Sequence, residues 1–245
     1  VHGLFAQERP HRCATAHYDS LRQARNPAYR ASRQRLEELI RRRQENAGLL
    51  RAARLQQEPI TIPVVVHVIH NNRSGTIGGA NNANISDAQI QAQIDVLNLD
   101  YRRRNADTVN APPEVRALGA DLEIGFQLAT RDPNGLLTNG ITRTLGDQAS
   151  YDPDDMGRLA NLVSWPPDRY LNIWVVTMSG IFIGYAQLPD GTGLPGLDPE
   201  NGAENSDGIM VDYRNFGLGG AVSSRLYNRG RTATHEVGHW LGLLH

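Results

Sequence analysis

The stretch that decides the fold lies at residues 235–245 and reads His-Glu-Val-Gly-His-Trp-Leu-Gly-Leu-Leu-His. On an α-helix, residues four apart share one face, so His235 and His239 project side by side and can bind one Zn²⁺. Gly242 has no Cβ and can adopt a left-handed conformation that ends the helix and turns the chain. That turn would bring His245 back as a third ligand and leave the fourth position open for water. The stretch therefore predicts a catalytic zinc site.

Glu236 is the candidate catalytic residue. It lies next to the first ligand, near the metal but outside the ligand set, where it can take a proton from the zinc-bound water and pass it to a leaving amine. Two histidines four apart also occur as ordinary core or surface residues. Five positions that match a zinc-site pattern in order favour the zinc site: His235, Glu236, His239, Gly242 and His245. The apolar residues of the stretch are expected to face the core and hold the helix in place: Val237, Trp240, Leu241 and Leu244.

These eleven residues match the zinc-binding signature of the metzincins, and their surroundings resemble the pappalysin family within that clan. The resembling segments are Thr232-Ala233-Thr234, Trp240, Tyr170–Val176 and, more faintly, Arg12-Cys13-Ala14-Thr15. The resemblance covers most of residues 59–245. It implies a secreted zinc-dependent endopeptidase that acts on a protein or peptide, with three histidine ligands and one glutamate as general base.

Residues 59–245 are expected to form an α/β (α+β) fold with a twisted mixed sheet, a backing helix and an active-site helix. Runs rich in β-branched residues predict strands at Ile60–His70, Leu122–Ala129, Ile141–Leu145, Tyr170–Met178, Ile183–Leu188 and Gly208–Asp212. Ser86 can cap a helix from Asp87 to about Arg102, and the zinc helix begins near Arg231. By the resemblance, this is the upper subdomain of a metzincin, the N-terminal part only of a catalytic domain. In metzincins a methionine-containing turn and the lower wall of the cleft follow the third histidine. By the resemblance, the lower subdomain is therefore expected to be missing from this sequence.

Residues 1–58, called the leader below, differ from the rest in charge. They contain twelve arginines and six acidic residues, whereas residues 59–245 contain thirteen arginines and twenty acidic residues. Residues 1–17 are expected to be irregular, and Ser20 to Gln57 predicts helix interrupted at Asn26-Pro27. The leader is therefore interpreted as a mainly helical pro-segment that docks on an acidic domain, or as a solvated arginine-rich helix. No recognition motif accompanies the arginines, so nucleic acid is not an expected partner.

Cys13 is the one cysteine of the chain and follows Arg12. A neighbouring cation favours the thiolate, which binds zinc strongly. Pappalysin-type leaders carry a similar Arg-Cys-Gly-Thr motif, although Ala14 departs from it here. The resemblance implies that Cys13 is a zymogen switch that occupies the fourth zinc position until the leader is cut away. The alternative is an incidental free cysteine, or one that has lost its partner.

The short strand that starts at Ile183 is the candidate substrate-binding edge. By the resemblance, Gly184, Tyr185, Ala186 and Gln187 would pair with an extended substrate through their backbones. An ordinary edge strand is the alternative.

Other features are given lesser roles. His67 and His70 are expected to be core or loop residues, and acidic loops at Asp152–Asp155 and Asp190–Asp207 make Ca²⁺ a second candidate ion. The sequence contains no run of eighteen apolar residues, so no membrane span is expected. Residues 1–6 fit the end of a secretory signal.

A zinc endopeptidase is the favoured function, and two alternatives stay open. One is a non-catalytic truncated fragment with only a binding role, because the segment that follows the third histidine in metzincins is absent. The other is an amidase or deamidase that uses the same zinc helix. Substrate preference, the activating protease and the oligomeric state cannot be read from the sequence.

Overall fold

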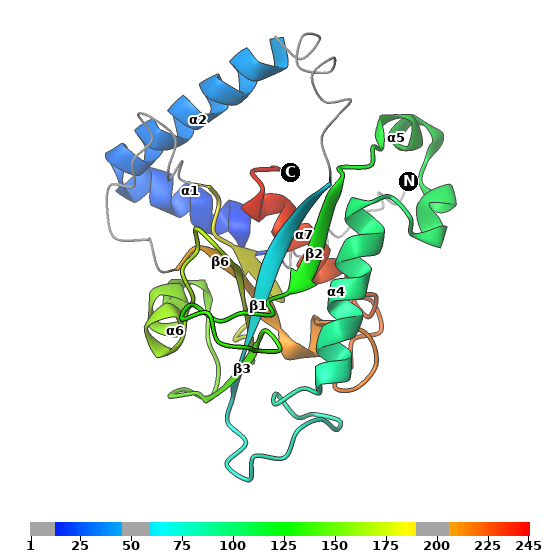
Figure 1. The fold of residues 1–245 in the computed structure, drawn as a ribbon. Coiled ribbons are helices and arrows are strands. Elements are labelled where there is room, and N and C mark those ends of the chain that lie inside the picture. Colours follow the sequence, from blue (N-terminus) through cyan, green and yellow to red (C-terminus); the bar gives the residue numbers. More distant parts are fainter. Residues whose placement is uncertain (1–12, 46–58, 190–205) are drawn as a thin grey trace, which may run out of the picture.

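The computed structural model describes residues 13–45, 59–189 and 206–245 (Figure 1). Its centre is a six-stranded sheet in the order β2-β1-β4-β6-β5, with β3 paired to the second half of β1. All pairs are parallel except β5 with β6, so β5 is an antiparallel edge strand. The strand bounds are β1 Ile60–His70, β2 Ile124–Leu128, β3 Ile141–Leu145, β4 Leu171–Val176, β5 Gly184–Ala186 and β6 Gly208–Asp212.

Side chains alternate along each strand, so both faces of this sheet carry apolar residues. Helices cover both faces. In β4, Ile173 and Val175 join a core cluster with α4 (Asp87–Tyr101) and α7 (Arg231–Trp240). Trp174 and its neighbours on the opposite face pack with α6 (Met156–Leu162) and the start of α1 (Thr15–Arg25). The remaining described elements are α2 Pro27–Glu45, α5 Pro113–Leu118 and the 3₁₀ turns Ala106–Asn110, Pro153–Asp155 and Tyr213–Asn215.

Helix α4 is the predicted backing helix, and it buries two amide side chains that hold the loop before α7. Ser86 caps it by accepting a hydrogen bond from the Gln89 amide. The side chain of Gln89 also donates to the carbonyl of Phe216 and accepts from the amide of Ala221. Gln93 donates to the carbonyl of Gly230, the residue before α7. These bonds tie the glycine-rich loop, and therefore the start of α7, to α4.

The predicted strands agree closely with the observed ones, and β1, β3 and β6 have the predicted bounds. The helix break at Asn26 is also confirmed. The predicted start of the leader helix was wrong. Helix α1 begins at Thr15 instead of about Ser20, because residues 15–18 pack against β5 and its neighbours. Predicted helix between residues 46 and 57 lies outside the described residues.

Two short helices, α5 and α6, were not predicted. The Asp152 side chain accepts a hydrogen bond from the Asp154 amide, and Asp155 accepts one from the Asp152 amide, which together form a capping box. The box begins the 3₁₀ turn that leads into α6. Among the described helices, none combines the length and apolar character needed to cross a bilayer.

Candidate metal centre

Helix α7 carries the first two histidines, and its first turn is anchored to the end of α4. Gly230, with φ of 68°, precedes the helix and provides no side-chain cap. Instead, the Asp100 carboxylate accepts a hydrogen bond from the Thr234 hydroxyl at 2.7 Å and pairs with Arg231 at 2.9 Å. The Tyr101 hydroxyl donates to the Thr234 carbonyl at 3.0 Å. The residue immediately before His235 is therefore held through both its side chain and its backbone.

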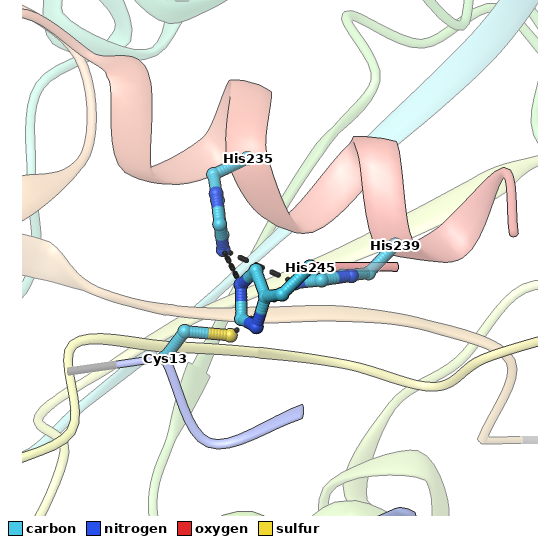
Figure 2. A group of neighbouring side chains, drawn as sticks. All are labelled: Cys13, His235, His239 and His245. Atoms are coloured by element: carbon cyan, nitrogen blue, oxygen red, sulfur yellow. Dashed lines mark hydrogen bonds between the residues drawn. The ribbon is translucent and has the colours of Figure 1, made fainter. Parts of the chain in front are cut away.

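The three predicted histidine ligands converge (Figure 2). The Nε2 atom of His235 lies 3.1 Å from Nε2 of His239 and 3.0 Å from Nε2 of His245. Gly242 has a φ of 93°, the left-handed conformation expected of it, and this turn brings His245 back toward the helix. The same turn leaves Leu244 56% exposed, so its predicted place in the core was wrong, whereas Val237 is fully buried.

The donor set fits zinc. Four ligand atoms, three imidazole nitrogens and the Cys13 sulfur, lie within 4.8 Å of one another. Donors bound to one tetrahedral zinc would lie roughly 3.3–3.7 Å apart. The Nδ1 atom of His239 is 2.7 Å from the Leu243 carbonyl, which only accepts, so Nδ1 carries the hydrogen and the Nε2 lone pair points at the cluster. A cation at the centre of the cluster would be bound through such a lone pair.

His235 is neutral in this arrangement. Burial, followed by the charges of His239 and His245, lowers the pKa of His235 to about 4. A metal binds the neutral imidazole, so the environment favours the form that can act as a ligand.

Glu236 lies beside the donor cluster and is 1% exposed. Its Oε2 atom accepts a hydrogen bond from the Thr15 hydroxyl at 2.9 Å, and the Cys13 thiol lies 3.7 Å away. Burial raises the pKa of Glu236 well above its usual value, and the charge of Cys13 adds to the rise. Within the described residues, its carboxylate therefore contacts the leader and stays outside the set of four converging donors.

The leader reaches the centre through residues 13–15. The Cys13 sulfur lies 3.4 Å from Nε2 of His239, and Cys13 forms a parallel bridge with Gly184 on the edge strand. The amide of Ala14 donates to the Gly184 carbonyl at 3.1 Å. Ala14 is fully buried in the core cluster under α6, so the methyl group that departs from the pappalysin motif fits its site.

Thr15 is a site residue that the sequence did not single out. Its hydroxyl donates to Glu236 and accepts a hydrogen bond from the Ala186 amide at 2.9 Å. The threonine of the leader motif was the available signal, but its two partners become visible only once β5 and α7 are placed.

The edge strand faces the leader through alternate residues. At the two ends of β6, the Ile183 carbonyl accepts a hydrogen bond from the Asp212 amide and the Gln187 amide donates one to the Gly208 carbonyl. The Gly184 carbonyl and the Ala186 amide instead point to residues 14 and 15. The side chains of Tyr185 and Gln187 are buried. Of the four residues predicted to bind substrate, Gly184 and Ala186 present backbone groups at the open edge.

Aromatic side chains fasten α1 beside this edge. The Tyr18 ring makes edge contacts with Phe182 and Tyr185, with centroids 6.2 and 5.8 Å apart. Arg22 lies over the Tyr185 ring at 5.9 Å. The leader thus covers the site with apolar and aromatic contacts as well as hydrogen bonds.

The other candidate features have structural roles. His67 is a core residue as expected, with ring nitrogens 2.7 Å from the Thr142 hydroxyl and 2.9 Å from Oδ1 of Asn172. The Asp152–Asp155 carboxylates cap a helical turn. Asp207 accepts a hydrogen bond from the Trp240 indole, and residues 190–205 lie outside the described residues.

No family model matches the chain, whereas curated proteins and solved structures do. An extracellular metalloprotease of Arthroderma gypseum is 29% identical over 188 residues, which is 76% of this chain and 48% of that protein. The chain thus spans about half the length of the curated relatives it matches. Mature mirolysin of Tannerella forsythia, solved with a cleaved peptide, is 44% identical over 77% of this chain and 65% of its own, with a TM-score of 0.65.

A promirolysin variant of the same organism is 38% identical and covers 95% of this chain and 69% of its own, with a TM-score of 0.70. A match to 95% of 245 residues is longer than residues 59–245, so it includes part of the leader.

Proposed function

Because this chain belongs to the metzincin-type zinc metalloproteases similar to mirolysin, we propose that it is a secreted, latent zinc endopeptidase. The observation that carries the proposal is the convergence of three Nε2 atoms and one sulfur at the end of α7. His235, His239 and His245 would hold the ion, and Cys13 would take the fourth position while the leader is in place. Secretion is supported by relatives named extracellular metalloproteases.

The chemistry needs a base beside the metal, and Glu236 would be that base. Zinc supplies a Lewis acid that activates water and polarises a carbonyl. Glu236 would accept the proton of the attacking water and deliver it to the leaving amine. Its position next to His235 on α7, beside the four donors, supports this role.

The outer edge of β5 would hold the substrate. The Gly184 carbonyl and Ala186 amide face away from β6 and bind the leader. Once the leader leaves, this acceptor and donor would be free to pair with an extended peptide, the way edge strands bind many sequences in one geometry. The cleaved peptide in mature mirolysin supports a peptide substrate here.

Latency follows from what residues 13–15 cover. The Cys13 sulfur lies against the proposed metal ligands, the Thr15 hydroxyl bonds the proposed base, and the two residues after Cys13 bond the edge strand. Three consecutive residues would thus cover the metal position, the base and the substrate-binding edge. The chain would become active when these contacts are removed.

The test compares Glu236→Ala with Glu114→Ala, an exposed glutamate on α5. Zinc content is measured by elemental analysis, and peptide hydrolysis is measured after limited proteolysis has removed the leader. We expect zinc in both proteins and a loss of turnover of about 10²- to 10⁴-fold in Glu236→Ala only. A chain without zinc, or a Glu236→Ala variant as active as the control, would contradict the proposal.

A further inference from the structure

Gly184 lies directly against Glu236, and no side chain fits between them. A Cβ placed on Gly184 would lie 2.5 Å from Oε1, 2.8 Å from Cγ and 2.9 Å from Cδ of Glu236. Apart from atoms of its own residue and its chain neighbours, a Cβ atom in a protein essentially never has a heavy atom within 3.0 Å. The edge strand and the proposed base therefore meet at a position that only glycine can occupy without a shift.

The need for glycine here is steric, not conformational. The φ of Gly184 is outside the left-handed region, unlike that of Gly242, so an alanine could adopt the same backbone. Any effect of a substitution at Gly184 must come from the space that its Cβ would take.

Glu236 has little freedom to move aside. Its side chain is buried, and Thr15 and Cys13 contact its carboxylate. The conflict includes Cγ, so a rotation of the carboxylate alone does not relieve it. Cγ moves only with a change of χ1, and few χ1 rotamers are open to a buried helical residue.

We infer that Gly184 is a positioning residue for Glu236, an inference that rests on the proposed role of Glu236 as the base. The backbone of Gly184 offers its carbonyl at the open edge, and its missing side chain sets where the carboxylate lies. The strand proposed to hold the peptide is also the wall that positions the group proposed to move the proton. A side chain at residue 184 would displace the base while leaving the three histidines in place.

A double-mutant cycle on thermal unfolding of the full chain tests this contact without using activity. Gly184→Ala should lower the Tm by about 5 °C, the shift expected of an overpacked position in a chain of this size. In a Glu236→Ala background the same substitution should cost about 1 °C or less, because the conflicting atoms are gone. Gly125→Ala is the matched control in β2, where a Cβ would meet its nearest neighbour, Asn98, at an ordinary 3.5 Å. It should shift the Tm equally in both backgrounds.

A catalytic measurement separates positioning from general damage. With the leader removed, the contacts from Thr15 and Cys13 are gone, but the conflict between an added Cβ and Cγ of Glu236 remains. Gly184→Ala should then lower kcat about 100-fold, the effect of misplacing a catalytic group by about 1 Å, with KM and zinc content unchanged. Equal Tm losses in the two backgrounds, or an unchanged kcat, would overturn the inference. An active Glu236→Ala variant would instead refute the proposed base, and the Tm cycle would still report on the contact itself.

Discussion

The hydroxyl of Thr15 donates a hydrogen bond to the carboxylate of Glu236 across 2.9 Å. This contact exists because the leader changes conformation at that residue. The carbonyl of Ala14 accepts the first bond of α1, from the Tyr18 amide, and is no longer available to the edge strand. The Ala186 amide bonds the Thr15 hydroxyl instead. One hydroxyl therefore completes the edge pairing and covers the proposed base.

Thr15→Val should loosen the leader. The substitution keeps the shape of the side chain and removes its hydrogen bonds to the Glu236 carboxyl group and the Ala186 amide. A hydrogen bond contributes about 0.5–1.5 kcal/mol, so loss of the two should raise peptide hydrolysis by the uncut chain roughly 5- to 100-fold. Thr232→Val is the control, because the buried Thr232 hydroxyl has no hydrogen-bond partner among the described residues. Uncut Thr15→Val as silent as this control would show that the hydroxyl does not contribute to latency.

Cys13 should be chemically protected while zinc is bound. If its sulfur holds the fourth metal position, the thiol of zinc-loaded, uncut chain resists alkylation, and chelation exposes it. The measurement is a thiol titration before and after chelator, followed by zinc add-back. Rapid alkylation of the zinc-loaded chain would contradict the switch, and Cys13→Ala should raise the activity of the uncut chain.

Asp100→Asn should destabilise the start of α7 and weaken zinc binding. The Asp100 side chain is 8% exposed and binds the Thr234 hydroxyl and the 43% exposed Arg231, so the exchange removes a charge from a partly buried pair. Loss of hydrogen bonds to a charged group costs about 1.5–3 kcal/mol. We expect a lower Tm and faster transfer of zinc to a chelator, because Thr234 precedes the first ligand. Asp121→Asn, at a carboxylate that pairs with Arg102 and is 39% exposed, should change stability by less than about 1 kcal/mol. Equal effects of the two substitutions would show that Asp100 does not support the site.

His67 should make the chain less stable in mild acid. Burial lowers the pKa of His67 to about 4, against about 6.5 when unfolded. Between these values the unfolded state binds the extra proton, so the free energy of unfolding decreases as the pH falls. Above about pH 6.5 the contribution of His67 to the free energy of unfolding is fully present, and by pH 4 it has decreased by about 3 kcal/mol. Urea unfolding of the wild-type chain and of His67→Gln over this pH range measures the contribution of His67. The other titrating groups are the same in the two proteins, so their effects cancel in the difference. Parallel curves would contradict the assignment.

Much of the fold was readable because local and tertiary preferences agree. The run Ile60–His70 is rich in β-branched residues and lies between Pro59 and Asn71-Asn72, which favour turns. It forms β1 with the predicted bounds. Ser86 predicted the start of α4 through its capping hydroxyl. The spacing of His235, His239 and His245 predicted three converging nitrogens, and the left-handed turn at Gly242 makes their approach possible.

What the sequence did not reveal depends on contacts between distant segments. Residues 15–18 have little helical signal of their own, and they become helical against Phe182 and Tyr185. The two roles of the Thr15 hydroxyl need β5 and α7 on either side of it. Leu244 looked like a core residue by type, but the turn that brings in the third ligand carries it outward. The switch role of Cys13 and the substrate role of the β5 edge stay predictions.

Helix α1 starts at Thr15, two residues after the Cys13 bridge, and this limits how the leader can be cut in its own site. Proteases cut chain that lies extended, and from Tyr18 onward the backbone amides of α1 are engaged in the helix. If the leader keeps the site latent, as proposed, residues 15–25 would be a poor substrate for the centre they cover. Removal of the leader would then depend on a cut elsewhere in the chain or on a second protease molecule.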